Sequence, residues 1–258
     1  MAVVTYEVEN HIGYVTLNRP DVLNCFNFET LSVLQGIVDD IYSDRNVRAV
    51  IFMGAGEKAF SAGADLKERR TLSESEVRRN VKKIREVFTA VESLPQPTIA
   101  ALNGYAFGGG FELALACDFR YAVEGTKMGL TETSLGIIPG AGGTQRLPRL
   151  IGTAKAMELV LTARKLSSEE AHEYGILNGV VNREELLTTC EELASEICRN
   201  APVAVQQAKF AVREGMNVDR HTGMAIESKA YEVTIPTKDR LEALEAFAEK
   251  RKPEFRGE

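Results

Sequence analysis

Residues 108–116 read Gly-Gly-Gly-Phe-Glu-Leu-Ala-Leu-Ala, three glycines followed at once by an apolar segment that holds one acid, Glu112. Adjacent glycines let a main chain approach a ligand closely, because no Cβ intervenes and positive φ angles are allowed. The apolar segment predicts a buried helix, whose first amide groups have no partner inside the helix and can donate to a developing oxyanion. We therefore expect Glu112 beside an oxyanion site, although a tight turn with a first-turn glutamate gives the same pattern.

Two further glycine-rich segments carry acids. Residues 60–68 read Phe-Ser-Ala-Gly-Ala-Asp-Leu-Lys-Glu, and residues 136–143 read Gly-Ile-Ile-Pro-Gly-Ala-Gly-Gly, with Glu132 just upstream. The amide of Ala64 is a candidate second donor to a carbonyl oxygen that becomes negative, and losing one such donor typically lowers a rate by ~10²–10³. Each segment taken alone also fits a plain loop, so the recurrence of glycines with acids carries the hypothesis.

Other catalytic or nucleotide-binding motifs are not supported. Residues 54–59 match G-x-G-x-x-A after an apolar run, but no long helix follows them, so a dinucleotide site is not expected there. The chain contains neither G-x-x-x-x-G-K-[ST] nor G-x-S-x-G. P-loop and serine-hydrolase chemistry therefore have no candidate residues.

Composition limits the class of partner and cofactor. The 258 residues include 31 basic and 37 acidic side chains, a net charge of −6, which disfavours nucleic acid as the main partner. The four cysteines show no metal-ligand spacing and there are only three histidines, so no metal site is predicted. We expect reduced cysteines in a reducing compartment.

The N-terminal segment and the hydropathy suggest a location. No basic stretch followed by an apolar one occurs at the N-terminus, and no apolar run approaches the ~20 residues that cross a bilayer. We predict no membrane association and a cytoplasmic protein, or one in the mitochondrial matrix if a transit peptide has been removed.

Hydrophobic periodicity predicts an α/β domain followed by helices. Alternation between residues 4 and 17 predicts a β-hairpin, and the apolar runs 47–53 and 98–102 predict buried strands separated by helices at 28–42 and 81–94. Residues 57–75 are expected to form a loop and a short helix. From about residue 185 strand signals cease, and helices are expected over 186–199, 203–214, 221–231 and 239–250. We divide the chain into a core, 1–190, and a helical region, 191–258.

Taken together, these segments resemble the crotonase, or enoyl-CoA hydratase, family over essentially the whole chain. The matching stretches are residues 19–24, 61–68, 103–113 and 136–147. The resemblance implies an α/β fold with a core of repeated ββα turns, the crotonase-like superhelix, and a C-terminal helical region that trimerises. Relatives commonly form hexamers built as dimers of trimers.

The resemblance also implies roles for particular residues. Ala64 and Gly109 match the two backbone donors of the oxyanion hole, and Glu112 and Glu132 match the two catalytic glutamates of the hydratases. Many relatives with other reactions lack one or both acids, so their joint presence favours hydration. The implied substrate- and coenzyme-A-binding residues are Ala62, Asp65, Leu66, Lys67, Gly140, Phe247 and Lys250. No metal and no cofactor is implied, because coenzyme A is part of the substrate.

The activity implied is that of an enoyl-CoA hydratase acting on short-chain 2-enoyl-CoA in fatty-acid β-oxidation or branched-chain amino-acid breakdown. Residues 127–133 and 235–242 resemble the branch that contains methylglutaconyl-CoA hydratase, and that activity and enoyl-CoA isomerisation remain alternatives. RNA binding, known in that branch, is less favoured because residues 30–42 contain no lysine. Asp21 and Cys25-Phe26 depart from the family pattern and leave the coenzyme A contacts of their loop open.

Overall fold

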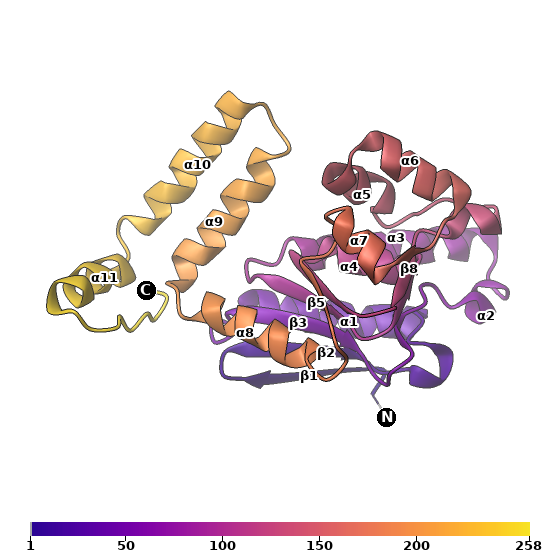
Figure 1. Ribbon diagram of the computed structural model, residues 1–258, viewed down its shortest axis with the longest axis horizontal. Coiled ribbons are helices and arrows are strands. Elements are labelled where there is room, and N and C mark those ends of the chain that lie inside the picture. Colours follow the sequence, from indigo (N-terminus) through magenta and orange to yellow (C-terminus); the bar gives the residue numbers. More distant parts are fainter. Residues whose placement is uncertain (1) are drawn as a thin grey trace.

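A six-stranded sheet forms the centre of the protein in the computed structural model, which describes residues 2–258 (Figure 1). Its strands, in spatial order, are β1 (Val4–Glu9), β2 (Ile12–Leu17), β3 (Ala49–Gly54), β5 (Thr98–Leu102), β7 (Phe119–Val123) and β10 (Gly179–Val181). The hairpin β1–β2 is antiparallel and every other pairing within this sheet is parallel. The hairpin and both buried strands predicted from the sequence are confirmed, although β3 begins at Ala49 rather than at residue 47.

A second, smaller sheet is parallel except for its last pairing, which is antiparallel. It contains β4 (Ala59–Ser61), β6 (Tyr105–Phe107), β8 (Lys127–Gly129) and β9 (Leu166–Ser167). Each of β3, β5 and β7 is followed within a few residues by a short strand of this sheet, so the chain repeatedly steps from the large sheet to the small one. Loops that follow parallel strands gather at one edge, and these steps therefore bring the glycine-rich segments together.

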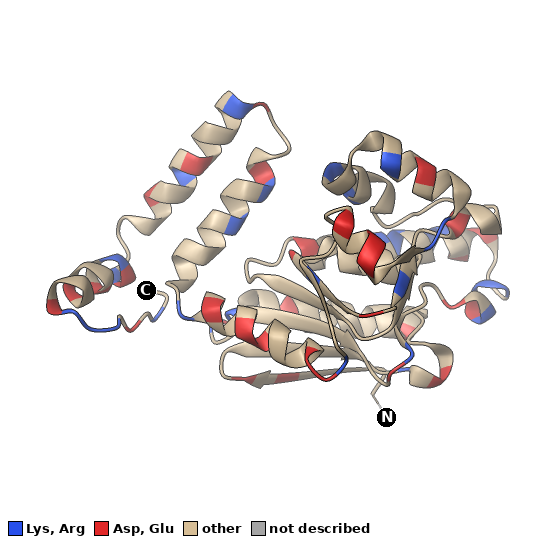
Figure 2. Ribbon diagram, in the orientation of Figure 1, with Lys and Arg blue, Asp and Glu red and all other residues tan. Residues whose placement is uncertain are grey.

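Side chains of the large sheet alternate between two apolar layers. In β3, Val50 and Phe52 face the main core, whereas Ala49 and Ile51 face α8 (Leu186–Cys198). The main core is covered by α1 (Phe28–Ser43), α3 (Glu74–Glu92) and α4 (Gly109–Ala116). Charged residues are absent from β3 and β5, which Figure 2 shows as uncharged ribbons inside the molecule. Both faces are thus buried, as expected for parallel strands.

The remaining elements connect or extend this body. They are α2 (Leu66–Arg69), α5 (Gly143–Ile151), α6 (Thr153–Thr162), α7 (Ser168–Glu173) and the 3₁₀ turns η1 (Pro20–Val22) and η2 (Glu132–Leu135). The C-terminal helices are α9 (Pro202–Gly215), α10 (Arg220–Thr234) and α11 (Lys238–Glu249). No helix within residues 2–258 is both long and apolar enough to cross a membrane.

The C-terminal helices extend away from the sheets. Helices α9 and α10 pack against each other as an antiparallel pair, and α11 lies at the far end of the molecule (Figure 1). Together with α8 they confirm the four helices expected after residue 185. The division of the chain after residue 190 stays a prediction, and that position lies inside α8.

The start of α3 differs from the sequence-based expectation. Residues 57–75 were expected to form a loop and a short helix, with the long helix beginning at residue 81, but α3 begins at Glu74. The Ser73 side chain accepts from the Glu76 amide, and the Glu76 carboxylate accepts from the Ser73 amide. This capping box satisfies the free amides of the first turn. It is readable in the sequence, whereas the apolar periodicity becomes clear only later in the helix.

Two glycine-rich segments touch main chain to main chain. A Cβ placed on Gly110 would lie 2.0 Å from the carbonyl oxygen of Ser61, and one on Gly63 would lie 2.8 Å from that of Phe107. Gly63 also has a φ of +94°, which other residues rarely adopt. The absence of side chains at these positions allows residues 61–64 to lie against residues 107–110.

A glycine substitution tests this contact. Gly110→Ala is expected to lower the free energy of unfolding by about 1–3 kcal/mol, because the added methyl group overlaps rigid main chain. Gly36→Ala in α1, where the new Cβ meets nothing within 4 Å, is the matched control and should raise it by roughly 0.5–1 kcal/mol. Urea unfolding of both variants measures the difference, and equal effects would contradict the packing described.

Candidate active site

A cavity of about 930 Å³ lies where the glycine-rich segments meet. Its walls come from residues 62–64, from the first turn of α4, from one face of α3 and from the loop 137–142. Both acids singled out in the sequence, Glu112 and Glu132, reach this cavity from different elements, α4 and η2. The three segments that combine glycines with acids thus enclose one space.

Two backbone amides on the cavity wall are free to donate. Ala64 and Gly109 both line the cavity. Within residues 2–258, neither amide donates to another main-chain group, whereas the neighbouring amides of Phe26 and Asp65 pair across the bridge between residues 26 and 64. Gly109 is also the first residue of α4, where the helix dipole favours negative charge. The pair is suited to stabilise an oxyanion.

Glu112 is a buried carboxylate held by main-chain donors. Its Oε1 accepts from the amide of Ala141 at 2.8 Å and from the amide of Gly143 at 2.9 Å. Ala141 lies in the loop that leads into α5 and Gly143 is the first residue of α5, so the carboxylate joins α4 to the start of α5. Burial raises its pKa above the ordinary value, while the two amides and the charges of Arg146 and Arg85 oppose the rise.

Glu132 has a different environment. A Cβ on Gly108 would lie 3.2 Å from its Oε1, a tight contact, and Gly108 also has a φ of +50°. Its Oε2 is buried and has no hydrogen-bond partner among the described residues. Burial, followed by the charge of Glu112, raises its pKa to about 7, and Arg69 acts in the opposite direction. Glu132 therefore holds a proton at pH values where an ordinary glutamate is ionised.

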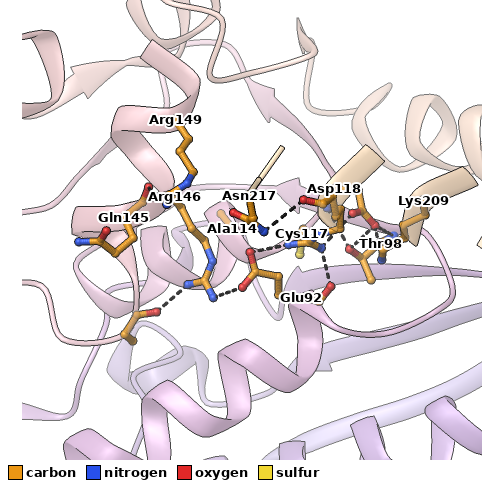
Figure 3. Close-up of polar contacts among 12 residues, drawn as sticks. Glu92, Thr98, Ala114, Cys117, Asp118, Gln145, Arg146, Arg149, Lys209 and Asn217 are labelled. Carbon is orange, nitrogen blue, oxygen red and sulfur yellow. Dashed lines mark hydrogen bonds and ion pairs between the residues drawn. The ribbon is translucent and has the colours of Figure 1, made fainter. Parts of the chain in front are cut away.

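An ion-pair network lies directly behind the loop that holds Glu112 (Figure 3). Arg146 of α5 donates to the carbonyl oxygen of Ala141 at 2.7 Å and also pairs with Glu92 at the end of α3. Glu92 accepts a second cation, Arg213 of α9, which also contacts Asp118 at 3.2 Å. The network fixes the loop that supplies the amide donors to Glu112, and it ties the C-terminal helices to the same place.

The predicted substrate-binding residues fall into two groups. Ala62, Leu66 and Gly140 line the cavity. Asp65 does not; it caps α2 by accepting from the amides of Lys67 and Glu68, and it pairs with Arg19 at 3.0 Å. Lys67 is exposed outside the cavity wall.

The two residues predicted in α11 are distant from this cavity. Phe247 is 86% exposed and Lys250 ends the helix in a left-handed conformation. Helix α11 lies at the opposite end of the molecule from α2 (Figure 1). The two residues do not reach the cavity of their own chain, and a contact across a subunit boundary stays a prediction.

Two cations in the cavity wall, Arg69 and Arg85, are absent from the site predicted from the sequence. Arg69 is the last residue of α2, five positions after Ala64 in the sequence. Arg85 lies on α3. Both stand in charged stretches that look like solvated surface. For Arg69, the sequence feature that could have indicated a place in the site is its position shortly after the segment that contains Ala64.

Comparisons with known proteins agree with this geometry. The sequence profile of the enoyl-CoA hydratase/isomerase family matches residues 7–258. The chain is 48% identical to the mitochondrial methylglutaconyl-CoA hydratase of Homo sapiens, over 97% of this chain and 76% of that protein. It is 44% identical to the short-chain-enoyl-CoA hydratase of Clostridium acetobutylicum, over 97% and 96% of the two chains.

A solved structure gives the same result for the fold. The crystal structure of an enoyl-CoA hydratase from Bacillus anthracis superposes with a TM-score of 0.97 at 51% identity, covering 99% of this chain and 100% of that one. The α/β crotonase-like fold expected from the sequence is therefore confirmed.

The ion-pair network provides a stability prediction. Glu92→Gln removes the charge shared by Arg146 and Arg213, and is expected to lower the free energy of unfolding by about 1–3 kcal/mol at pH 7. Although burial opposes it, the two arginines lower the pKa of Glu92 below 4.5. The stabilisation is complete above pH 4.5 and is lost as pH falls through the lowered value, so the difference from wild type should shrink there.

Glu86→Gln is the matched control, because Glu86 is exposed on the same helix and, among residues 2–258, pairs only with Lys82. Its effect should stay within about 0.5 kcal/mol. Thermal unfolding at pH 7 and pH 4 measures both variants, and a Glu92→Gln curve that matches the control would exclude a stabilising network.

Proposed function

Because the chain belongs to the enoyl-CoA hydratase/isomerase family, we propose that it adds water across the 2,3 double bond of a short-chain 2-enoyl-CoA to give the 3-hydroxyacyl-CoA. The observation that carries this proposal is the placement of Glu112 and Glu132 on one cavity beside two free amides. The printed names of two relatives, a short-chain-enoyl-CoA hydratase and a methylglutaconyl-CoA hydratase, support hydration as the reaction.

The chemistry follows from the position of each group. The amides of Ala64 and Gly109 bind the thioester oxygen, which draws electron density from the double bond and makes Cβ electrophilic. Glu112 removes a proton from water as the water oxygen bonds to Cβ, and Glu132 gives its proton to Cα. The product then leaves with both elements of water added, and proton exchange with solvent restores the two acids.

The different environments of the two acids favour this division of roles. Glu112 accepts two amide hydrogen bonds, which stabilise the ionised form that a base needs. Glu132 has an unpartnered Oε2 and a pKa raised to about 7, so it can carry the proton that an acid needs. Because the two charges interact, the titration belongs to the pair.

Isomerisation of the double bond is the rival reaction within the family, since it also moves a proton at Cα. Isomerisation requires no water molecule held between two acids. The presence of two carboxyl groups on this cavity therefore favours hydration. For the acyl group we propose only that it is short. For the pathway we propose fatty-acid or branched-chain amino-acid breakdown. The reaction as written needs no metal and no cofactor besides the coenzyme A of the substrate, and we do not propose nucleic acid as a partner.

We also propose a homo-trimer or a hexamer, supported by apolar side chains that the isolated chain leaves exposed. They lie on the C-terminal helices and include Phe210, Met224, Tyr231, Leu244 and Phe247. Exposed apolar surface on this scale is typical of an interface. The compartment we propose is the cytoplasm or the mitochondrial matrix, and the printed name of the human relative describes that protein as mitochondrial.

Replacing either glutamate tests the reaction. Glu112→Gln and Glu132→Gln are each expected to lower kcat for crotonyl-CoA by a factor of ~10²–10⁴, because each positioned acid or base contributes about that factor. Loss of absorbance at the enoyl-thioester band measures hydration. Glu124→Gln, an exposed glutamate between the two in sequence, is the control and should retain wild-type turnover.

Coenzyme A thioester binding, measured by calorimetry with crotonyl-CoA, should survive in both glutamine variants. Wild-type-like turnover in either variant would overturn the assignment. If wild-type protein shifts the double bond of a 3-enoyl-CoA but hydrates no 2-enoyl-CoA, isomerisation replaces hydration as the function.

The pH dependence provides a second test. A carboxyl group whose pKa is raised to about 7 keeps its proton below pH 7 and loses it above. If Glu132 donates that proton, kcat/KM for crotonyl-CoA is expected to stay level from pH 6 toward 7 and then to fall about tenfold per pH unit. A profile that rises through pH 7 would instead require Glu132 to act ionised.

A further inference from the structure

Arg146 of α5 packs beneath the loop that holds Glu112, yet it does not line the cavity. Its Nη1 donates to the carbonyl oxygen of Ala141 at 2.7 Å. A Cβ on Gly142 would lie 2.1 Å from the same nitrogen, and Gly142 has a φ of +106°, which suits glycine. The guanidinium therefore occupies the space that a side chain at residue 142 would need. Without touching the substrate, it can influence the cavity through the main chain that it contacts and through its charge.

Two nitrogens of the Arg146 guanidinium are paired and one is not. Nη1 bonds to Ala141, and Nη2 pairs with Glu92 (Figure 3). The side chain is only 11% exposed, and its Nε is shielded from solvent without a hydrogen-bond partner among residues 2–258. A buried donor without a partner is unfavourable for folding, and features of this kind concentrate at functional sites. The position of Arg146 thus carries a cost for folding, which a role in the reaction would explain.

Ala141 connects the arginine to the acid. Its carbonyl oxygen accepts from Arg146, while its amide donates to Oε1 of Glu112 at 2.8 Å. The second donor to Oε1 is the amide of Gly143 at 2.9 Å. The peptide group between residues 141 and 142, which Arg146 holds, therefore lies between the two donors. Because glycine at residue 142 leaves the backbone soft, this peptide group needs an external partner to keep one orientation.

Charged groups reach Glu112 from three elements around α4. Burial raises the pKa of Glu112, and the two amides, then Arg146 of α5 and Arg85 of α3, lower it. Glu132 of η2 is the second acid on the cavity, and the charge of Glu112 raises its pKa. The strands β4 and β6, which also contact α4, contain no charged residue. Arg85 is exposed, so solvent weakens its field, and Arg146 is the more effective of the two cations.

We propose that Arg146 is a positioning residue of the hydration reaction, holding the loop at residues 141–143 so that its amides keep the Glu112 carboxylate in place as the base. This inference rests on the proposed hydration and adds a residue that lies outside the cavity. If the loop turned, Glu112 would lose donors and take up a proton, and a displaced base is inefficient even when it is ionised. Arg146 thus acts on the rate through Glu112, without a contact to the substrate.

The test uses crotonyl-CoA and the intact protein. Arg146→Met is expected to lower kcat about 10–100-fold, the worth of a hydrogen bond to a charged group, while KM stays within about threefold because no group that binds substrate is removed. Arg146→Lys keeps the charge but cannot bond the Ala141 carbonyl and Glu92 at once, so it should recover only part of kcat. Arg149→Met is the matched control and should keep wild-type kcat. Arg149 is exposed on the same helix and, among residues 2–258, donates only to the carbonyl oxygen of Gln145.

The pH profile separates positioning from a general loss of structure. Glu112 must be ionised to act as the base, so kcat/KM rises with pH through its pKa. Loss of the Arg146 cation removes a group that lowers this pKa. The rising limb should therefore move to higher pH in Arg146→Met and stay near its wild-type position in Arg146→Lys. An unchanged limb in Arg146→Met, with kcat reduced, would assign the residue to stability alone and overturn the proposal.

A double-mutant cycle tests whether Arg146 acts through Glu112. In the Glu112→Gln background, where no carboxylate remains to be held, Arg146→Met should change the residual kcat by no more than about twofold. A further loss as large as that in the wild-type background would mean that Arg146 acts elsewhere, and it would overturn the positioning role.

The remaining outcomes are equally decisive. Wild-type kcat in Arg146→Met would overturn the positioning role and leave the proposed hydration intact. Absence of hydration by the wild-type protein would overturn the proposed function itself. If Arg146→Met does not fold, as urea unfolding would reveal, Arg146→Lys is compared with Arg149→Lys. Equal kcat values for these two variants would then overturn the proposal, and a lower value for Arg146→Lys would support it.

Discussion

The hydrogen bonds from the amides of Ala141 and Gly143 to the Glu112 carboxylate are the interaction on which the site depends. A carboxylate buried in an apolar helix needs donors, or it takes up a proton and ceases to be a base. Helix α4 has none to offer, because its other side chains are apolar or absent. The donors must come from elsewhere in the chain, and the loop before α5 together with the first residue of that helix supplies them.

That requirement explains the construction around the loop. Gly143 must be close enough that a Cβ there would lie 3.1 Å from Cγ of Glu112. The carbonyl oxygen of Ala141 is held from behind by Arg146, and Arg146 is held by Glu92. Glu92 in turn pairs with Arg213 of α9. This ion pair therefore helps to fix the position of the Glu112 carboxylate inside the core. Main-chain donors in a fixed loop also cost no reorganisation during a reaction.

The sequence revealed the parts of the site that depend on local chemistry. Glycine at 108–110 and at 63 marks where main chains touch, and the acids beside them are visible for the same reason. Apolar runs predict β3 and β5, and helical periodicity predicts the C-terminal helices. The ion-pair network was not predicted, because Glu92 and Arg146 are 54 residues apart and look like ordinary surface charges. Only the packing of both α3 and α5 against α4 brings them together.

Arg69 shows why the inner surface of a cavity is the hardest part to predict. Its neighbours Lys67, Glu68 and Arg70 are all charged, and nothing in that run indicates which side chain turns inward. The short helix α2 determines which side chain turns inward. Asp65 caps this helix and so fixes the direction in which its last residue, Arg69, points.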